Sequence, residues 1–284
     1  MSDLMSGVDR MTRAFWRVTG RRVEVGGDQA WLDAPMHRES VIGDNWLSDA
    51  AAAIGGVVVR DEPGGGLLPE FAALDGPHFR AAAVHPDIRD FYERTSLWRM
   101  EVWTGWNPIF QPFGEFIARY FGRRVQQLTI PTRPLDTALG MDSDIAAIVA
   151  PDGRQSGAGW IRRLRSTGAY VYSGFYRVTT LPETTQPSVH VSFPLESGNV
   201  QVFLRPRALS DGSLELLSTR GTFGTDGAYL TVSRGGIVHA TRLPLHETFR
   251  LYVDDDGVLR TDHVIRIRSA VAVRLHYKLT RTQA

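Results

Sequence analysis

The sequence predicts a mainly β fold of the α+β class, in which an antiparallel meander over the C-terminal half closes into a barrel. The first observation is that glycine-containing turn clusters recur at intervals that leave room only for short strands. The second is the period-two alternation of apolar residues between these turns, as in Val189, Val191 and Phe193. A flat sheet of roughly ten strands would leave long edges exposed, so closure is expected. The clusters are Asp152-Gly153, Thr167-Gly168, Ser197-Gly198-Asn199, Asp211-Gly212-Ser213, Gly235-Gly236 and Asp254–Gly257.

Residues 1–80 are expected to form a small mixed α/β segment that precedes the barrel domain at 81–284. A helix over 3–19 has one apolar stripe, and the glycine that follows ends it. Its arginines lie on another face. A basic amphipathic helix can lie on anionic lipid, but packing on the protein's own domain is commoner for a helix of this length. A hairpin over 23–32, a short helix capped by Asp44 or Asn45 that ends at Gly55-Gly56, and a loop over Asp61–Gly66 complete this segment.

A second helix is expected to begin at His85-Pro86-Asp87, because proline is pre-set for the first turn and the aspartate complements the helix dipole. Residues 98–121 form the most aromatic part of the chain. Within them, a helix over 112–121 carries rings on more than one of its rows, which is more apolar surface than one contact face requires. Phe116 and Tyr120 are therefore candidate ligand-binding residues, with ordinary core packing as the alternative.

The early strands of the meander supply further candidate ligand-binding residues. Tyr170, Tyr172 and Tyr176 lie at even spacings and are expected to face one way. Trp160 and Arg162 lie on the strand before them. In a barrel interior the hydroxyl groups would orient a ligand, whereas on the outside the same residues would form an ordinary strand surface. Both alternatives remain open.

The last three strands allow a prediction of register, because apolar residues must share one face and a slip of one residue would reverse every side chain. On the other face, this register places Arg250, Asp262 and His276 side by side. A carboxylate beside an imidazole orients it as a general base, so these three are candidate catalytic residues. A solvated outer sheet face with paired charges is the alternative. The expected cross-strand pairs are Phe249 with His263, Leu251 with Thr261, Ile265 with Val273, and Ile267 with Val271.

Composition limits the chemistry that the chain can perform. Without cysteine there is no disulfide, thiolate nucleophile or cysteine-ligated metal, and a reducing cytoplasm is the expected location. The net charge of +1, with basic residues spread along the chain, disfavours a nucleic-acid partner. Metal, Walker, Rossmann and Gly-x-Ser-x-Gly motifs are absent, so no cofactor and no metal are expected. No apolar run is long enough to cross a bilayer, and nothing indicates an oligomeric state.

Four stretches of the chain carry a family resemblance: Val84–Arg94, Gly159–Tyr176, Phe203–Pro206 and Leu259–His263. Together they resemble an uncharacterised group of actinobacterial proteins. The resemblance covers residues 84–279 and leaves residues 1–80 outside it. It implies no activity, ligand or catalytic residue, so the functional hypotheses depend on the residues themselves.

The leading hypothesis is binding of an apolar or amphipathic small molecule in the barrel, with arginine or tyrosine side chains fixing its polar end. Barrels of the calycin and lipocalin type use that arrangement, so this is an analogy at the level of the fold. The alternative is a cofactor-independent enzyme, such as an isomerase, cyclase or hydrolase, that acts on a hydrophobic substrate in the same cavity by proton transfer. Both hypotheses require a cavity of about a few hundred cubic ångströms.

Overall fold

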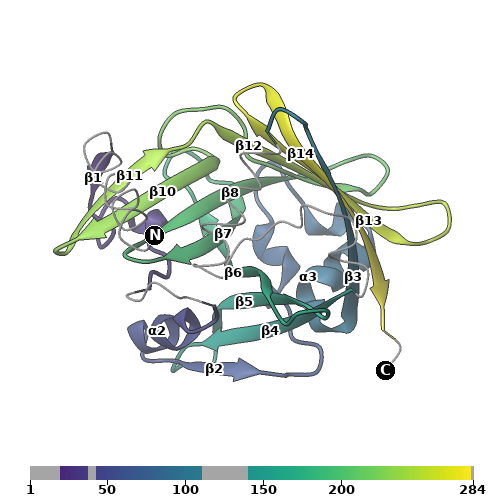
Figure 1. Ribbon diagram of the computed structural model, residues 1–284, viewed down its shortest axis with the longest axis horizontal. Helices are drawn as coiled ribbons and strands as arrows, with labels where there is room; N and C mark the ends of the chain where they lie inside the picture. The colour runs from purple at the N-terminus through teal and green to yellow at the C-terminus, as the bar shows by residue number, and fades with distance from the viewer. Residues whose placement is uncertain (1–19, 38–42, 111–139, 283–284) are drawn as a thin grey trace.

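The computed structural model of the chain describes residues 20–37, 43–110 and 140–282 (Figure 1). The helices expected over 3–19 and 112–121 lie outside these residues. The described helices are α2 (Trp46–Ala53) and α3 (Pro86–Glu93), with short 3-10 turns at Ala30–Leu32, Phe71–Leu74, Ala81–Ala83 and Thr95–Leu97. The described strands are β1 (Arg21–Val23), β2 (Val57–Arg60), β3 (Trp98–Trp106), β4 (Met141–Val149), β5 (Gln155–Leu164), β6 (Tyr170–Thr180), β7 (Pro187–Leu195), β8 (Gly198–Ala208), β9 (Leu214–Leu217), β10 (Gly227–Arg234), β11 (Ile237–Arg242), β12 (Leu245–Val253), β13 (Leu259–Ile267) and β14 (Ala270–Arg281).

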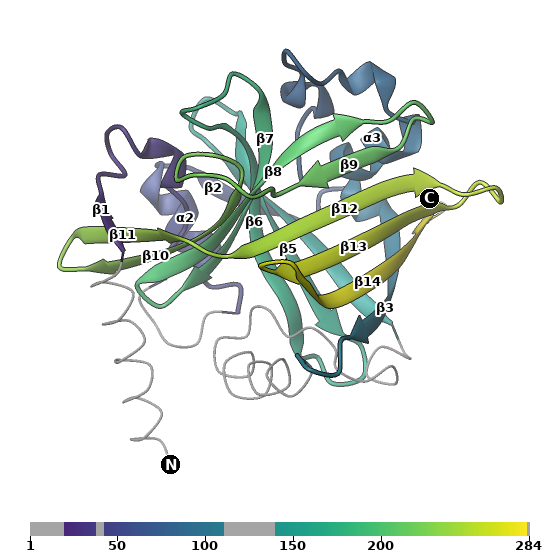
Figure 2. The same cartoon turned by 90° about the horizontal axis from the view of Figure 1, so that it is seen from above.

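The strands form one antiparallel sheet of 14 strands that branches at β8. The main path runs β2-β4-β5-β6-β7-β8-β9-β12-β13-β14-β3. The first half of β8 pairs with β10 and the second half pairs with β9, so one long strand serves two partners along the same edge. From β10 the branch continues through β11 to β1. Figure 2 shows β10 and β11 leaving on one side of this branch, and β12, β13 and β14 leaving on the other.

The mainly β, antiparallel character of the chain is confirmed, but the prediction that the meander closes into a barrel is wrong. The main path ends at β2 and β3, and no ladder between described residues joins these two strands. Two features explain the open sheet. The β2 strand occupies part of the edge of β4 that a closing strand would need, through pairs from Val57 with Val149 to Arg60 with Ala146. The branch at β8 also diverts β10 and β11 away from the main path.

The helix α3 begins where the sequence predicts. Pro86 occupies the first turn, and the backbone N–H of Asp87 donates to Nδ1 of His85 at 3.2 Å. Its buried residues, Ile88, Phe91 and Tyr92, belong to the main core of the molecule, inside the curved sheet. This core also contains Leu67, Leu68, Phe71, Leu74 and Phe79, so described residues on both sides of position 80 share it.

Two smaller cores lie on the outer side of the sheet. One joins α2 to the outer face of β4 and β5, where Trp46 and Leu47 are fully buried (Figure 1). The other joins Trp31 and Leu32 to Phe203 of β8 and Tyr229 of β10. Among the described residues, no helix has the length and apolar character that crossing a membrane requires.

The register predicted for the last strands is confirmed at three of its four pairs. Phe249 faces His263, Leu251 faces Thr261, and Ile265 faces Val273. The fourth pair is wrong, because the ladder shifts between Ile265 and Arg266, and Ile267 therefore faces Ala270. A tight turn at Arg268, whose φ is 56°, replaces the longer loop expected there.

Candidate functional site

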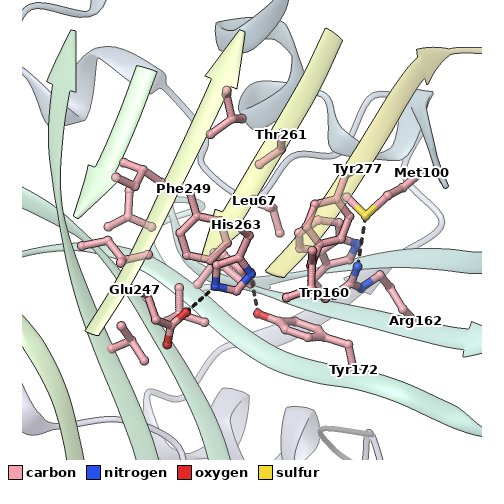
Figure 3. A pocket seen from close by; sticks show the side chains of 18 of the residues that line it. Leu67, Met100, Trp160, Arg162, Tyr172, Glu247, Phe249, Thr261, His263 and Tyr277 are labelled. Atoms are coloured by element: carbon pink, nitrogen blue, oxygen red, sulfur yellow. Dashed lines mark hydrogen bonds and ion pairs between the residues drawn. The ribbon is translucent and has the colours of Figure 1, made fainter. Parts of the chain in front are cut away.

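A partly enclosed cavity of about 150 Å³ lies on the concave side of the curved sheet (Figure 3). Strands β3 to β9 and β12 to β14 contribute to its wall, together with α3 and Leu67. The wall is mostly apolar and includes the rings of Phe91, Trp160, Phe193 and Phe249. An apolar cavity of about this volume holds a benzene molecule, whereas drug-sized ligands need about 300 Å³ or more. The cavity therefore suits a compact molecule with a single ring.

The strand period explains which residues reach this cavity. On β5, Trp160 and Arg162 point inward; on β12 and β13, the inward rows include Glu247 with Phe249 and His263 with Ile265. These rows are otherwise apolar. Arg162, Glu247 and His263 consequently bring ionisable groups into an apolar space, where each needs a partner to offset its burial.

Arg162 is the ionisable residue with the weakest set of partners. It is only 7% exposed, and its Nη1 donates to Sδ of Met100 at 3.0 Å, although a thioether is a weak acceptor. Its Nε has no hydrogen-bond partner. The guanidinium carbon lies 4.8 Å from the ring centre of Trp160 and 4.4 Å from that of Tyr172. Among the described residues, no carboxylate forms an ion pair with it.

A buried guanidinium without a counter-ion is costly. The group stays protonated at any ordinary pH, and the effective penalty for removing such an ion from water is on the order of several kcal/mol. Contacts with two aromatic faces recover about 2 kcal/mol or more of that penalty. Carboxylates are the groups that pair most strongly with a guanidinium, through two parallel hydrogen bonds.

Glu247 and His263 form a second polar feature on the wall. Nε2 of His263 lies 2.9 Å from Oε2 of Glu247; His263 is buried and the Glu247 side chain is 13% exposed. The residues are diagonal neighbours, since His263 directly faces Phe249 and its ring stacks on that phenyl ring at 3.7 Å. Glu247 thus holds one ring nitrogen. The opposite edge of the imidazole faces the hydroxyl group of Tyr172 (Figure 3).

Three tyrosines complete the polar part of the wall. The hydroxyl groups of Tyr172 and Tyr176 lie 2.5 Å apart, and Tyr277 is close to Arg162. Burial raises the pKa of all three phenols above the ordinary value, although the Arg162 charge opposes that rise. The phenols therefore remain protonated and can donate hydrogen bonds to a ligand.

The structure brings together four of the seven residues predicted to bind a ligand. Trp160, Arg162, Tyr172 and Tyr176 all line the cavity. Phe116 and Tyr120 lie outside the described residues. Tyr170 faces the other side of the sheet.

The prediction that the three tyrosines of β6 face one way is wrong at Tyr170. The register between β5 and β6 shifts there, so Arg162 faces Tyr172 while Arg163 already faces Tyr170. The intervening Val171 is an extra residue on β6 and, like Tyr172, lines the cavity. Tyr170 is thereby turned outward, where its hydroxyl group donates to Oδ1 of Asp44 at 3.0 Å.

Tyr170→Phe is expected to lower the free energy of unfolding by about 1 kcal/mol, because it removes a hydrogen bond to a charged acceptor. Urea denaturation would measure this loss. A double-mutant cycle with Asp44→Ala separates the pair from the other contacts of Asp44. A coupling energy indistinguishable from zero would contradict the outward orientation of Tyr170.

The predicted catalytic row of Arg250, Asp262 and His276 is present in the structure, but it does not line the cavity. Arg250 faces Asp262, and Asp262 faces His276, as the register requires. Nδ1 of His276 lies 2.7 Å from Oδ1 of Asp262, with side chains 38% and 51% exposed, respectively. Arg250 instead pairs with Asp211 at 3.0 Å. The row thus lies on the exposed face of the sheet, opposite to the face that carries His263.

Sequence reasoning overlooked Glu247 and His263, although a signal for them exists. Each is the one ionisable residue on an alternating row that is apolar apart from Thr261: Leu245, Glu247, Phe249, Leu251 and Val253 on one strand, and Leu259, Thr261, His263, Ile265 and Ile267 on the next. Two such interruptions on paired strands predict contact between the interrupting residues. The predicted register had already placed them two positions apart.

Within the described residues, no group of three or more potential ligands is arranged to hold a metal ion. The chain matches no family model, no curated protein and no solved structure. The cavity and its charged residues are therefore the basis for assigning a function.

Proposed function

We propose that the protein binds a compact organic anion, such as a single-ring aromatic acid, in the cavity, with the anionic group on Arg162. The observation that carries this proposal is a buried guanidinium that faces an apolar cavity and has no carboxylate partner among the described residues. The apolar lining supports a ligand with a hydrocarbon body, and the volume of about 150 Å³ limits that body to about one ring.

Arg162 discriminates between anionic and neutral ligands of the same shape. Hydrogen bonds to a charged group contribute about 1.5–3 kcal/mol each, and a dry, apolar surrounding strengthens them. Glu247 leaves the guanidinium available, because its carboxylate is paired with His263 and forms no ion pair with Arg162. A neutral ligand would leave the buried charge without a counter-ion, so it gains much less from the same site.

The cellular setting is part of the proposal. A chain without cysteine needs no oxidising compartment, so we place the ligand among small organic acids of the cytoplasm. The net charge of +1 gives the surface no general attraction for polyanions, which supports a small-molecule anion instead of a nucleic acid as the partner.

Benzoate and benzamide test this proposal, because they share a ring and a planar head group and differ in charge. We expect isothermal titration calorimetry at neutral pH to show that the wild type binds benzoate at least about tenfold more tightly than benzamide. Arg162→Met should weaken benzoate binding by at least about tenfold and change benzamide binding little.

The matched control is Arg250→Met, which removes an arginine from the exposed face of the sheet. This variant should bind benzoate as the wild type does. Equal affinities of the wild type for the two ligands, or unchanged benzoate binding in Arg162→Met, would show that Arg162 is not an anion site.

A further inference from the structure

We propose that His263, oriented by Glu247, is a general base that removes a proton from a carbon beside a carbonyl group of the bound anion. This inference depends on the proposed function, since Arg162 must hold the anionic end of the same molecule. The substrate class is a compact aromatic 2-oxo acid: its carboxylate meets Arg162, its ring meets the apolar wall, and an acidic C–H bond lies between ring and carbonyl.

The first support is the orientation of the imidazole. Glu247 approaches Nε2 at 2.9 Å, so when that nitrogen carries the proton, Nδ1 holds the lone pair. Figure 3 shows this other edge of the ring directed away from Glu247 and toward Tyr172. A carboxylate that fixes one nitrogen and leaves the other as the acceptor is the arrangement that general-base catalysis requires.

The second support is that one tyrosine links the two charged sites. The ring of Tyr172 lies 4.4 Å from the guanidinium carbon of Arg162, and its hydroxyl group points toward His263. A molecule held at Arg162 therefore extends along Tyr172 toward the imidazole. The Tyr172 and Tyr176 phenols, which stay protonated, lie beside that path and can donate a hydrogen bond to a carbonyl oxygen.

The proposed reaction is an enolisation that needs no co-reactant. The C–H bond breaks, an N–H bond forms at Nδ1 of His263, and the electron pair of the C–H bond moves through the carbonyl group onto its oxygen. The phenol whose O–H group is not used in the contact between Tyr172 and Tyr176 donates a hydrogen bond that stabilises the enolate. The imidazolium then returns the proton, either to the oxygen to give the enol or to the carbon to regenerate the ketone. Atoms and electrons balance in both directions.

A pair on the exposed face of the same strands provides a natural comparison. Asp262 and His276 form a carboxylate–imidazole contact of 2.7 Å, close to that of Glu247 with His263, but they do not line the cavity described above. If a histidine–carboxylate pair alone were sufficient for proton transfer, both pairs would be active. The proposal assigns activity only to the pair that faces the bound anion.

Phenylpyruvate is the probe, because it combines a carboxylate, one ring and an acidic CH₂ group beside a carbonyl. Proton NMR in D₂O follows exchange of this CH₂ group for deuterium, above the rate in buffer alone. We expect the wild type to accelerate exchange, His263→Gln to reduce the acceleration by about 100-fold or more, and Glu247→Gln to reduce it as well. Benzoate titration of both variants separates a loss of exchange from a loss of anion binding, since Arg162 is unchanged in them.

His276→Gln is the matched control and should retain the wild-type rate of exchange. If phenylpyruvate displaces benzoate but His263→Gln exchanges as fast as the wild type, the inference is overturned and the binding proposal stands. Failure of phenylpyruvate to displace benzoate overturns the substrate class. If benzoate itself does not bind, the proposed function fails, and the inference fails with it.

Discussion

Arg162→Met is expected to make the ligand-free protein more stable, by about 1–3 kcal/mol, at the expense of ligand binding. The guanidinium is buried, has no carboxylate partner among the described residues and donates to a thioether. Replacing buried charges with apolar groups of similar volume often stabilises a protein by about 1–4 kcal/mol, and the lost contacts with Trp160 and Tyr172 reduce that gain. Thermal unfolding would show the net gain in stability as an increase of roughly 2–10 °C in the unfolding midpoint.

Benzoate should reverse this order of stability. A ligand present at about 100 times its dissociation constant adds about 2.7 kcal/mol to the state that binds it, and only the wild type has the anion site. Arg250→Met, at the exposed face, should shift the midpoint little in either condition. A lower midpoint for ligand-free Arg162→Met than for the wild type would contradict our view that Arg162 is retained for binding instead of stability.

Phe203→Ala is expected to lower the free energy of unfolding by about 3–5 kcal/mol, the largest change that we predict. The ring is 0% exposed and stacks on the imidazole of His190, with 4.2 Å between ring centres. It also meets the edges of Trp31 and Tyr229 at 5.2 and 5.7 Å. Removing it leaves a void at the point where β8 branches, inside the core formed by Trp31, Phe203 and Tyr229.

Urea denaturation followed by tryptophan fluorescence measures this loss. Ile237→Ala removes a side chain that is 41% exposed and should change stability by no more than about 0.5 kcal/mol. The cavity lies on the other side of β8, lined by Val202 and Leu204, so folded Phe203→Ala should still bind benzoate. A loss below about 1 kcal/mol would mean that this outer core is not what joins Trp31 to the sheet.

The sequence by itself determined the local features of the molecule. Period-two alternation and turn residues are short-range signals, and they predicted an antiparallel β chain and the start of α3 at Pro86. They also predicted the register of β12 with β13, because a slip would exchange the apolar and polar faces of both strands. Trp160 and Arg162, two of the predicted ligand-binding residues, lie two positions apart on β5, and the structure places both at the cavity.

Only the tertiary structure decided which edges pair and which face is enclosed. The extra residue Val171 turns Tyr170 outward, and no local pattern distinguishes such a bulge from regular alternation. Asp262 and His263 are neighbours on β13 and therefore point to opposite faces of the sheet. Only the tertiary structure encloses the face that carries His263. Pairing of β2 with β4 and the branch at β8 join residues far apart in the sequence. Such long-range pairing depends on the combined packing of many segments, so alternation within each strand could not predict an open sheet or the enclosure of Glu247 and His263 in a cavity.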